Sequence, residues 1–170
     1  MSTSILAGLM AFFILTGAAG HAAAPEIPTY TVTVTAYNAV PSQTDENPFV
    51  TASGAYSNPA VVAARSRDLA DTLPFGTVIE IETPDRSDTC GYSVVSGSVG
   101  YRVIADSMNA RIQNTVDVLL PEVSSARTLG SCKDVTIRVV GHIDLSKPSN
   151  LPKSQSALAA LVDASGLALK

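Results

Sequence analysis

The sequence predicts a mainly β protein that forms a small closed barrel with an intervening helix. Three observations lead to this fold class: short strand-like segments follow one another closely, their apolar residues alternate, and Gly- or Pro-containing turns separate them. The chain has 170 residues, which is the length of one ordinary domain. We expect that domain to occupy residues 30–144, between an N-terminal leader and a C-terminal tail.

The predicted strands are short and lie close together along the chain. The first, residues 30–37, is the clearest, because Val32, Val34 and Ala36 fall on one face of a strand. The segment 84–100 is expected to form a hairpin, with a turn signal at Ser96-Gly97. The segments with a strand pattern are residues 30–37, 59–64, 77–82, 93–95, 101–105, 116–120 and 135–140.

One or two short helices are expected. Residues 121–129 form the first, because Pro121 suits the first helical position and Gly130 suits the position after the last turn. The tail, residues 145–170, is expected to begin as a linker, since it combines Pro, Ser and Lys without an apolar period. Its end, residues 156–169, could form a weak apolar helix or remain a frayed terminus.

Residues 1–23 are predicted to be a secretory signal peptide. The apolar run of residues 5–16 is too short to span a bilayer comfortably, and small residues of the kind that signal peptidase prefers follow it. The segment before this run has no Lys or Arg, so an uncleaved membrane anchor is the alternative. A cleaved leader predicts a periplasmic or secreted protein with no membrane association after cleavage.

The two cysteines, Cys90 and Cys132, are predicted to form a structural disulfide. When an exported domain has only two cysteines, the two most often bond to each other. Such a bond would join the 84–100 hairpin to the start of the last strand. A closed loop of about 40 residues would stabilise the fold by roughly 3–4.5 kcal/mol in the chain-entropy model. Two buried free thiols are the alternative.

The charge pattern excludes several classes of partner and site. Eleven Lys and Arg residues against fifteen Asp and Glu residues give a net charge of −4 without any basic run, so a nucleic-acid partner is not expected. Outside the leader, the chain has one histidine, His142, and two cysteines, which are too few for an ordinary four-ligand zinc site. We therefore expect a monomer that uses no metal and no cofactor.

Two aspartates are candidates for catalysis. Asp117 lies between Val116 and Val118 in an apolar strand, where burial would raise its pKa towards that of a useful proton donor. Asp106 ends the strand 101–105, and the ends of strands lie at the rim of a barrel, where sites usually form. The alternatives are a carboxylate on the solvent face of an edge strand for Asp117 and a turn cap for Asp106.

Further polar residues are candidates for binding substrate. Asp68 is one of them, although the N-cap of a short turn is the alternative role for it. Thr51, Ser53 and Gly54 form a small, hydroxyl-bearing segment that lets a backbone approach a polar ligand such as a sugar, and the alternative is an ordinary turn. A cluster of Asp68 with the two catalytic candidates could still hold a hard cation such as calcium or magnesium.

Taken together, these residues resemble the three-aspartate (3D) domain family. The resemblance covers about residues 31–142, and the ordered series of motifs is much more specific than any single one. The motifs that carry it, in chain order, are Thr35-Ala-Tyr-Asn38, Gln43-Thr44-Asp45, Thr51-Ala-Ser-Gly54, Val62-Ala-Ala, Ser66-Arg-Asp68, Leu73-Pro-Phe-Gly-Thr77, Asp106-Ser-Met-Asn-Ala-Arg111, Val116-Asp-Val118, Ala126 and Leu129-Gly130.

The resemblance implies a fold, an activity and a set of site residues. The implied fold is a six-stranded double-psi β-barrel, as in the membrane-bound lytic transglycosylase A and the stationary-phase muralytic enzymes. The implied activity is cleavage of peptidoglycan glycan strands at the MurNAc–GlcNAc bond, which gives a 1,6-anhydro product. By resemblance, Asp117 takes the catalytic acid/base position, Asp106 stands beside it, and Asp68 is the third of the name-giving aspartates.

The segment after Asp106 departs from the family pattern. Muralytic members carry Asp-Thr-Gly-Gly-x-Ile-x-Gly there, whereas this chain has Asp106-Ser-Met-Asn-Ala-Arg111. The glycines that would let a glycan lie close to the backbone are absent, while Arg111 adds a candidate contact to a sugar or a carboxylate. The spacing from Asp106 to Asp117 is kept. The alternative function is therefore that of a non-catalytic glycan-binding or accessory protein of the cell envelope.

Overall fold

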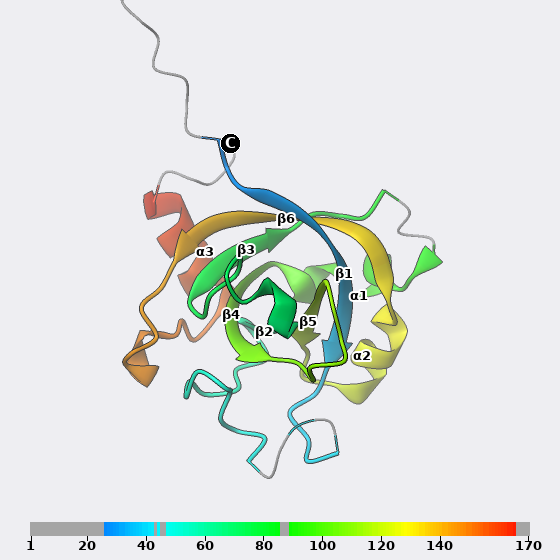
Figure 1. The fold of residues 1–170 in the computed structure, drawn as a ribbon, viewed down its shortest axis with the longest axis horizontal. Coiled ribbons are helices and arrows are strands. Elements are labelled where there is room, and N and C mark those ends of the chain that lie inside the picture. Colours follow the sequence, from blue (N-terminus) through cyan, green and yellow to red (C-terminus); the bar gives the residue numbers. More distant parts are fainter. Residues whose placement is uncertain (1–25, 43, 45–46, 86–88, 166–170) are drawn as a thin grey trace, which may run out of the picture.

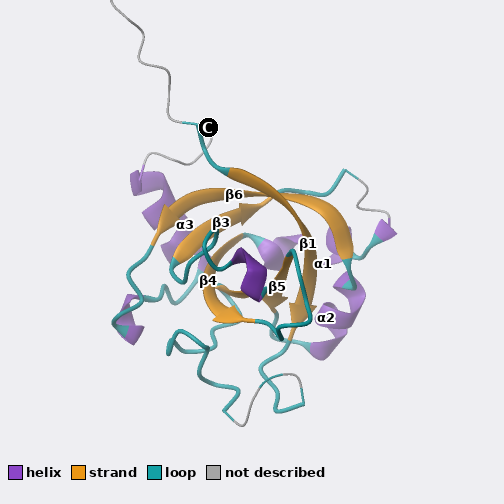
Figure 2. Ribbon diagram, in the orientation of Figure 1, coloured by secondary structure: helices purple, strands orange, loops and turns teal. Residues whose placement is uncertain are grey.

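Six strands close into one barrel (Figure 1 and Figure 2). This computed structural model describes residues 26–42, 44, 47–85 and 89–165, so the predicted signal peptide lies outside the described residues. Around the barrel the strands follow the order β1-β5-β2-β4-β3-β6, and β6 pairs back to β1. Their bounds are β1 (Thr29–Tyr37), β2 (Val62–Arg65), β3 (Thr77–Ile81), β4 (Tyr101–Ser107), β5 (Thr115–Leu119) and β6 (Cys132–His142).

The pairing pattern divides the barrel into two interlocked halves. β1 pairs in parallel with β5, and β2 pairs in parallel with β4. The contacts β1–β6, β2–β5, β3–β4 and β3–β6 are antiparallel. One half consists of β1, β2 and β3, and the other of β4, β5 and β6. Exchanging β1 with β4, β2 with β5 and β3 with β6 reproduces every one of these pairs. In the order around the barrel, strands of the two halves alternate. This is the six-stranded double-psi β-barrel that the resemblance to the three-aspartate family implies.

The strand predictions agree with the structure where the alternation is clear. Along β1, Val32 and Val34 are buried, as the predicted pattern requires. β2 begins at Val62 rather than at residue 59, because the carbonyl oxygen of Asn58 accepts hydrogen bonds from the backbone N–H groups of both Val61 and Val62. The residues that precede β2 therefore form a turn.

The predicted strand at residues 93–95 is wrong, and so is the hairpin at residues 84–100. Residues Tyr92–Val99 form helix α1 instead, with Tyr92, Val95 and Val99 buried. These three positions follow the three- and four-residue spacing of a helix, which outweighs the short apolar run that suggested a strand.

Helix α2 (Val123–Leu129) confirms the predicted helix, although it begins at Val123 rather than at Pro121. Gly130 follows it with a φ of 64°, in the left-handed region that glycine favours. α2 packs closely against the start of α1 at Gly91, where a Cβ atom would lie 1.8 Å from the carbonyl oxygen of Thr128. Only a glycine fits this approach.

Helix α3 (Gln155–Ser165) docks on the barrel, so the tail is not a frayed terminus over these residues and the described chain has three short helices. Its residues Leu158 and Val162 are buried. The Gln155 side chain holds its first turn, because it accepts a hydrogen bond from the N–H of Tyr101 and donates to the carbonyl oxygens of Tyr101 and Ala60. Among the described residues, no helix is long and apolar enough to cross a bilayer.

Cys90 and Cys132 form the predicted disulfide, with their Cα atoms 5.4 Å apart. The bond joins the segment before α1 to the first residue of β6, so it fixes a helix rather than the predicted hairpin to the barrel. A structural disulfide indicates an oxidising compartment.

Reduction of the Cys90–Cys132 disulfide is expected to lower the melting temperature of the protein. The bond spans a sequence separation of 42 residues. A loop of this length corresponds to roughly 3–4.5 kcal/mol, which is about 10 °C for a domain of this size. Thermal unfolding followed by circular dichroism, with and without a reducing agent, measures the shift. The Cys90→Ala/Cys132→Ala variant should melt like the reduced protein, and an unchanged melting temperature in both cases would contradict a stabilising role.

Candidate functional site

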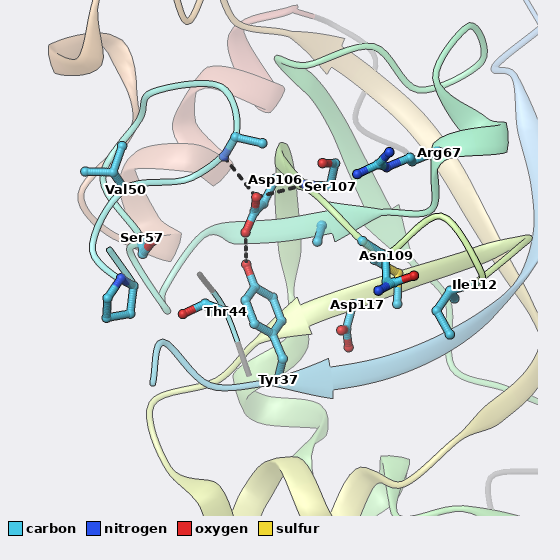
Figure 3. A pocket seen from close by; sticks show the side chains of 14 residues that line it. Tyr37, Thr44, Val50, Ser57, Arg67, Asp106, Ser107, Asn109, Ile112 and Asp117 are labelled. Carbon is cyan, nitrogen blue, oxygen red and sulfur yellow. Dashed lines mark hydrogen bonds between the residues drawn. The ribbon is translucent and has the colours of Figure 1, made fainter. Parts of the chain in front are cut away.

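Both predicted catalytic aspartates line one pocket of about 650 Å³ (Figure 3). The barrel strands supply the centre of the pocket, with Tyr37 from β1, Ala64 from β2, Asp106 from β4 and Asp117 from β5. The loops that follow β1 and β4 supply its sides. Its volume lies within the range of small-molecule sites.

Strand β2 sets the relative position of the two aspartates. Ala64 pairs with Asp106 on β4 and with Asp117 on β5, so the three residues form one row across neighbouring strands. Neighbouring strands lie about 4.8 Å apart, which places the two aspartate Cα atoms roughly 10 Å apart with their side chains on the same face. The small methyl group of Ala64 leaves space for a ligand between them.

A β-bulge turns Asp106 towards the pocket. Ala63 pairs with Ile104, but the next residue, Ala64, pairs with Asp106, so Ala105 is an additional residue in β4. Regular pairing would place Ala105 opposite Ala64 and would move Asp106 to the other face of the sheet, because side chains alternate with a period of two. The bulge is therefore what brings the second carboxylate into the site.

Three donors hold the Asp106 carboxylate in place. Its Oδ2 atom accepts a hydrogen bond from the Tyr37 hydroxyl at 3.0 Å, and its Oδ1 atom accepts from the backbone N–H groups of Ala52 and Ser107 at 2.9 Å each. Figure 3 shows Tyr37 extending from β1 to reach Asp106. The bond to Ala52 also ties the loop after β1 to β4, so the orientation of Asp106 and the position of the loop depend on each other.

Asp117 has the properties of a proton donor near neutral pH. Burial raises its pKa to about 6, and the negative charge of Asp106 adds to this rise. The Thr35 hydroxyl, on the adjacent strand β1, donates to Asp117 Oδ1 at 2.7 Å and acts in the opposite direction because it stabilises the carboxylate. A carboxyl group with this pKa can both give and take a proton.

The side chains that donate hydrogen bonds to the two aspartates include Tyr37 and Thr35, for which the motif Thr35-Ala-Tyr-Asn38 alone predicted no role in the site. Tyr37 is only 8% exposed, and burial together with the charge of Asp106 raises its pKa far above the ordinary value. The phenol therefore stays protonated and donates a hydrogen bond to the Asp106 carboxylate. A signal was present in the sequence, because strand alternation places Thr35 and Tyr37 on the same face of β1.

Asp68 lies in the 3-10 turn Arg67–Leu69 and does not line the pocket. Its carboxylate accepts a hydrogen bond from the backbone N–H of Asn114 at 2.9 Å, and its bonds to Ser66 and Asn114 lower its pKa. The cluster of three aspartates that could hold a cation is not formed, since no group of three or more His, Cys, Asp or Glu residues in the described ranges could bind a metal. A role for Asp68 in substrate binding stays a prediction.

Thr51, Ser53 and Gly54 shape a loop beside the pocket rather than line it. Thr51 is buried, and its hydroxyl bonds to that of Ser53 at 3.0 Å. Gly54 has a φ of 84°, in the left-handed region. Ala52, between Thr51 and Ser53, does line the pocket, and its N–H donates a hydrogen bond to Asp106. Direct contacts of the three predicted residues with a substrate stay a prediction.

Arg111 is exposed and lies outside the lining of the pocket, whereas Arg67 and Asn109 belong to it (Figure 3). Arg67 begins the 3-10 turn η1 (Arg67–Leu69), which follows β2 directly. Arg67 therefore brings a guanidinium group to this pocket, and a contact of Arg111 with a substrate stays a prediction. Its place just after the strand that carries Ala64 was the available signal.

The site offers one carboxyl group that can exchange a proton, one carboxylate that is fixed by donors, and a polar rim with a guanidinium group. No family model matches the chain, and no curated protein matches it. The function is therefore inferred from the contacts of Asp106 and Asp117.

Asp117→Asn is expected to stabilise the folded protein at neutral pH. The pKa of about 6 in the folded state lies above the unfolded value of about 3.9. The folded state therefore holds the proton more tightly, and the wild type loses stability as the pH rises from about 4 to about 6. Asparagine avoids this loss and still accepts the hydrogen bond from Thr35. The free energy of unfolding of Asp117→Asn should therefore exceed that of the wild type by about 1–3 kcal/mol at about pH 7.5 and by little near pH 4.

Urea unfolding of the wild type and Asp117→Asn at both pH values measures this difference in the free energy of unfolding. Asp163→Asn, at an exposed position on α3, is the control for the change of net charge. An Asp117→Asn protein less stable than the wild type at the higher pH would show that the carboxylate stabilises the barrel.

Proposed function

We propose that this protein is an exported lytic transglycosylase of the three-aspartate family that cleaves the MurNAc–GlcNAc bond of peptidoglycan glycan strands. The observation that carries the proposal is the difference between two neighbouring carboxyl groups. Asp117 has a pKa of about 6, whereas the oxygens of Asp106 are occupied by three donors. One group is thus suited to proton transfer and the other to a fixed negative charge.

A single acid/base suffices for lytic transglycosylation, whereas ordinary glycosidases use two carboxyl groups. The Asp117 carboxyl protonates the glycosidic oxygen as the bond from C1 breaks, which releases the GlcNAc hydroxyl and leaves an oxocarbenium-like MurNAc. The Asp117 carboxylate then takes the proton of the MurNAc C6 hydroxyl, and that oxygen attacks C1 to close the 1,6-anhydro ring. The nucleophile belongs to the substrate itself, which lowers the entropic barrier, and Asp117 ends the cycle protonated.

Asp106 supports this reaction electrostatically. Its negative charge raises the pKa of Asp117 and so keeps more of the acid form available. The same charge favours the positive charge that develops at C1 in the transition state. Because Tyr37, Ala52 and Ser107 hold Asp106 in one orientation, the charge need not reorganise during the reaction.

The disulfide supports an extracytoplasmic location for the proposed activity. The Cys90–Cys132 bond agrees with an oxidising compartment, and the signal peptide that the sequence predicts at residues 1–23 would provide the route of export. The periplasm or the cell exterior, where peptidoglycan lies, is therefore the proposed site of action, and glycan strands are the proposed partner of a monomeric protein.

Non-catalytic glycan binding is the second candidate function. Met108 and Asn109 line the pocket at the positions where the family pattern has glycines, so their side chains occupy space near the backbone that a glycan would otherwise approach. The two candidates differ in what Asp117 does: it transfers protons in the first, and it is only a polar contact in the second.

Incubation of the mature protein with purified sacculi is expected to release 1,6-anhydro muropeptides, which mass spectrometry identifies. Asp117→Asn should lower this release by about 10²–10⁴-fold, because it removes the titrating proton but keeps the size of the side chain. Asp163→Asn is the control and should keep the wild-type rate. Sacculi that bind the wild type but yield no anhydro product would favour the binding function, and a fully active Asp117→Asn would end the catalytic assignment.

The rate of cleavage is expected to fall above about pH 6 as Asp117 loses its proton, by about tenfold in kcat/KM per pH unit. Asp106→Asn should move this fall to lower pH, because it removes a negative charge that raises the pKa of Asp117. The asparagine can accept the bonds from Ala52 and Ser107 and donate to the Tyr37 oxygen, so the fold is retained. If the rate of Asp106→Asn begins to decrease at the same pH as that of the wild type, or at a higher pH, the electrostatic role of Asp106 would be contradicted.

A further inference from the structure

A second cavity, of about 590 Å³, lies next to the site pocket and shares one lining residue with it, Ala52. The proposed reaction uses none of its other residues. They come from the loop after β1, the turn before β3 and the segment around the end of β6. These residues are Ser53, Phe75, His142, Asp144, Leu145 and Ser146.

The two cavities meet at Ala52, whose position is fixed by backbone hydrogen bonds. The N–H of Ala52 donates to Asp106 at 2.9 Å, and the N–H of Ser53 donates to the carbonyl oxygen of Ala105 at 3.1 Å, so this boundary is tied to β4. Ala52 is exposed, and its side chain is only a methyl group. A polymer that extended from the pocket of Asp117 into the second cavity would therefore meet no large side chain at the shared residue.

The walls of the second cavity are built by close backbone packing. Gly76 has a φ of 95°, and a Cβ atom there would lie 2.9 Å from Cε1 of His142 and 2.1 Å from the carbonyl oxygen of Ile143. The imidazole of His142 therefore lies against the turn before β3. The Phe75 ring in this turn is backed by the buried Arg65 guanidinium, 4.8 Å from the ring centroid. Both rings are held by the barrel rather than by a mobile loop.

The groups that line the second cavity can form hydrogen bonds with a saccharide. Hydroxyl groups of Ser53 and Ser146, the imidazole of His142 and the carboxylate of Asp144 offer both donors and acceptors to sugar hydroxyls. Asp144 accepts bonds from the N–H and the hydroxyl of Ser146 at 2.9 and 2.8 Å, which lower its pKa and keep it an acceptor. The Phe75 ring adds an apolar surface for the C–H face of a sugar ring.

We infer that a glycan strand passes Ala52 from one cavity to the other, and that the second cavity binds sugar units on one side of the cleaved bond. This inference rests on the proposed function of the first pocket. It implies that the protein prefers long strands to short ones, because contacts far from the reacting bond then contribute to binding.

The test compares two probes: glycan strands freed of their stem peptides by an amidase, and the tetrasaccharide built from two GlcNAc–MurNAc units. His142→Ala removes a contact, and Ser146→Trp fills the cavity. Both are exposed positions outside the pocket of Asp117. Each variant should raise KM for long strands by about tenfold, the effect of one or two lost hydrogen bonds, and should reduce the preference for long strands accordingly. Val94→Ala, at a 74% exposed position on α1 that lines neither cavity, is the control.

A binding measurement separates the inference from the proposed activity. Binding of the same long strands to Asp117→Asn, with and without His142→Ala, should weaken by about tenfold when the imidazole is removed. Cleavage with an unchanged preference for long strands in both variants would overturn the inference and leave the activity standing. Binding that weakens in the variants of a protein that cleaves nothing would support the second cavity and overturn the activity. A wild type that neither binds nor cleaves long strands would overturn both.

Discussion

The site depends on one constraint, the placement of β2 as a short buried strand between β4 and β5. All four residues of Val62–Arg65 are buried, and Ala64 pairs on both sides. β2 belongs to one half of the barrel, whereas its two neighbours belong to the other half. The interlocking of the halves therefore places Asp106 and Asp117 in one row, and the small size of Ala64 keeps the space between them open. A larger side chain at this position would occupy the space where a substrate is proposed to bind.

The same interlocking is fixed by a charged side chain in the core. Arg102 is fully buried, and its guanidinium donates to the carbonyl oxygens of Ser98 and Val99 at the end of α1, of Pro59 before β2, and of Leu119 in β5. Burial lowers its pKa to about 10, so the group stays charged at neutral pH. A buried charge is costly unless hydrogen bonds offset the loss of water, and here carbonyl groups, including those at the negative end of a helix, do so. Arg102 thereby ties together the elements that position the aspartates.

Local patterns predicted the parts of the structure that depend on local geometry. Alternation along β1, the glycine after α2 and the lone cysteine pair each carry their own signal, and the structure confirms all three. Helix α1 was predicted as a strand because the short apolar run at residues 93–95 was weighed above the helical spacing of Tyr92, Val95 and Val99. The bulge at Ala105 depends on the register of distant strands, which no local pattern encodes. Asp117 was identifiable because an acid in an apolar strand is conspicuous, whereas no local pattern indicates that Asp68 and Arg111 lie outside the lining of the pocket.

Asp106 and Asp117 flank Ala64 in equivalent positions, yet their surroundings give them different properties. Asp106 receives three donors and Asp117 one, so burial dominates at Asp117 and raises its pKa to about 6. Two of the donors to Asp106 come from the end of β1 and the loop that follows it, Tyr37 and Ala52. That loop also carries Ala52, the residue that lines both cavities. A change that moved the loop would therefore alter two features together: the boundary between the cavities and the hydrogen bonds that hold the Asp106 carboxylate.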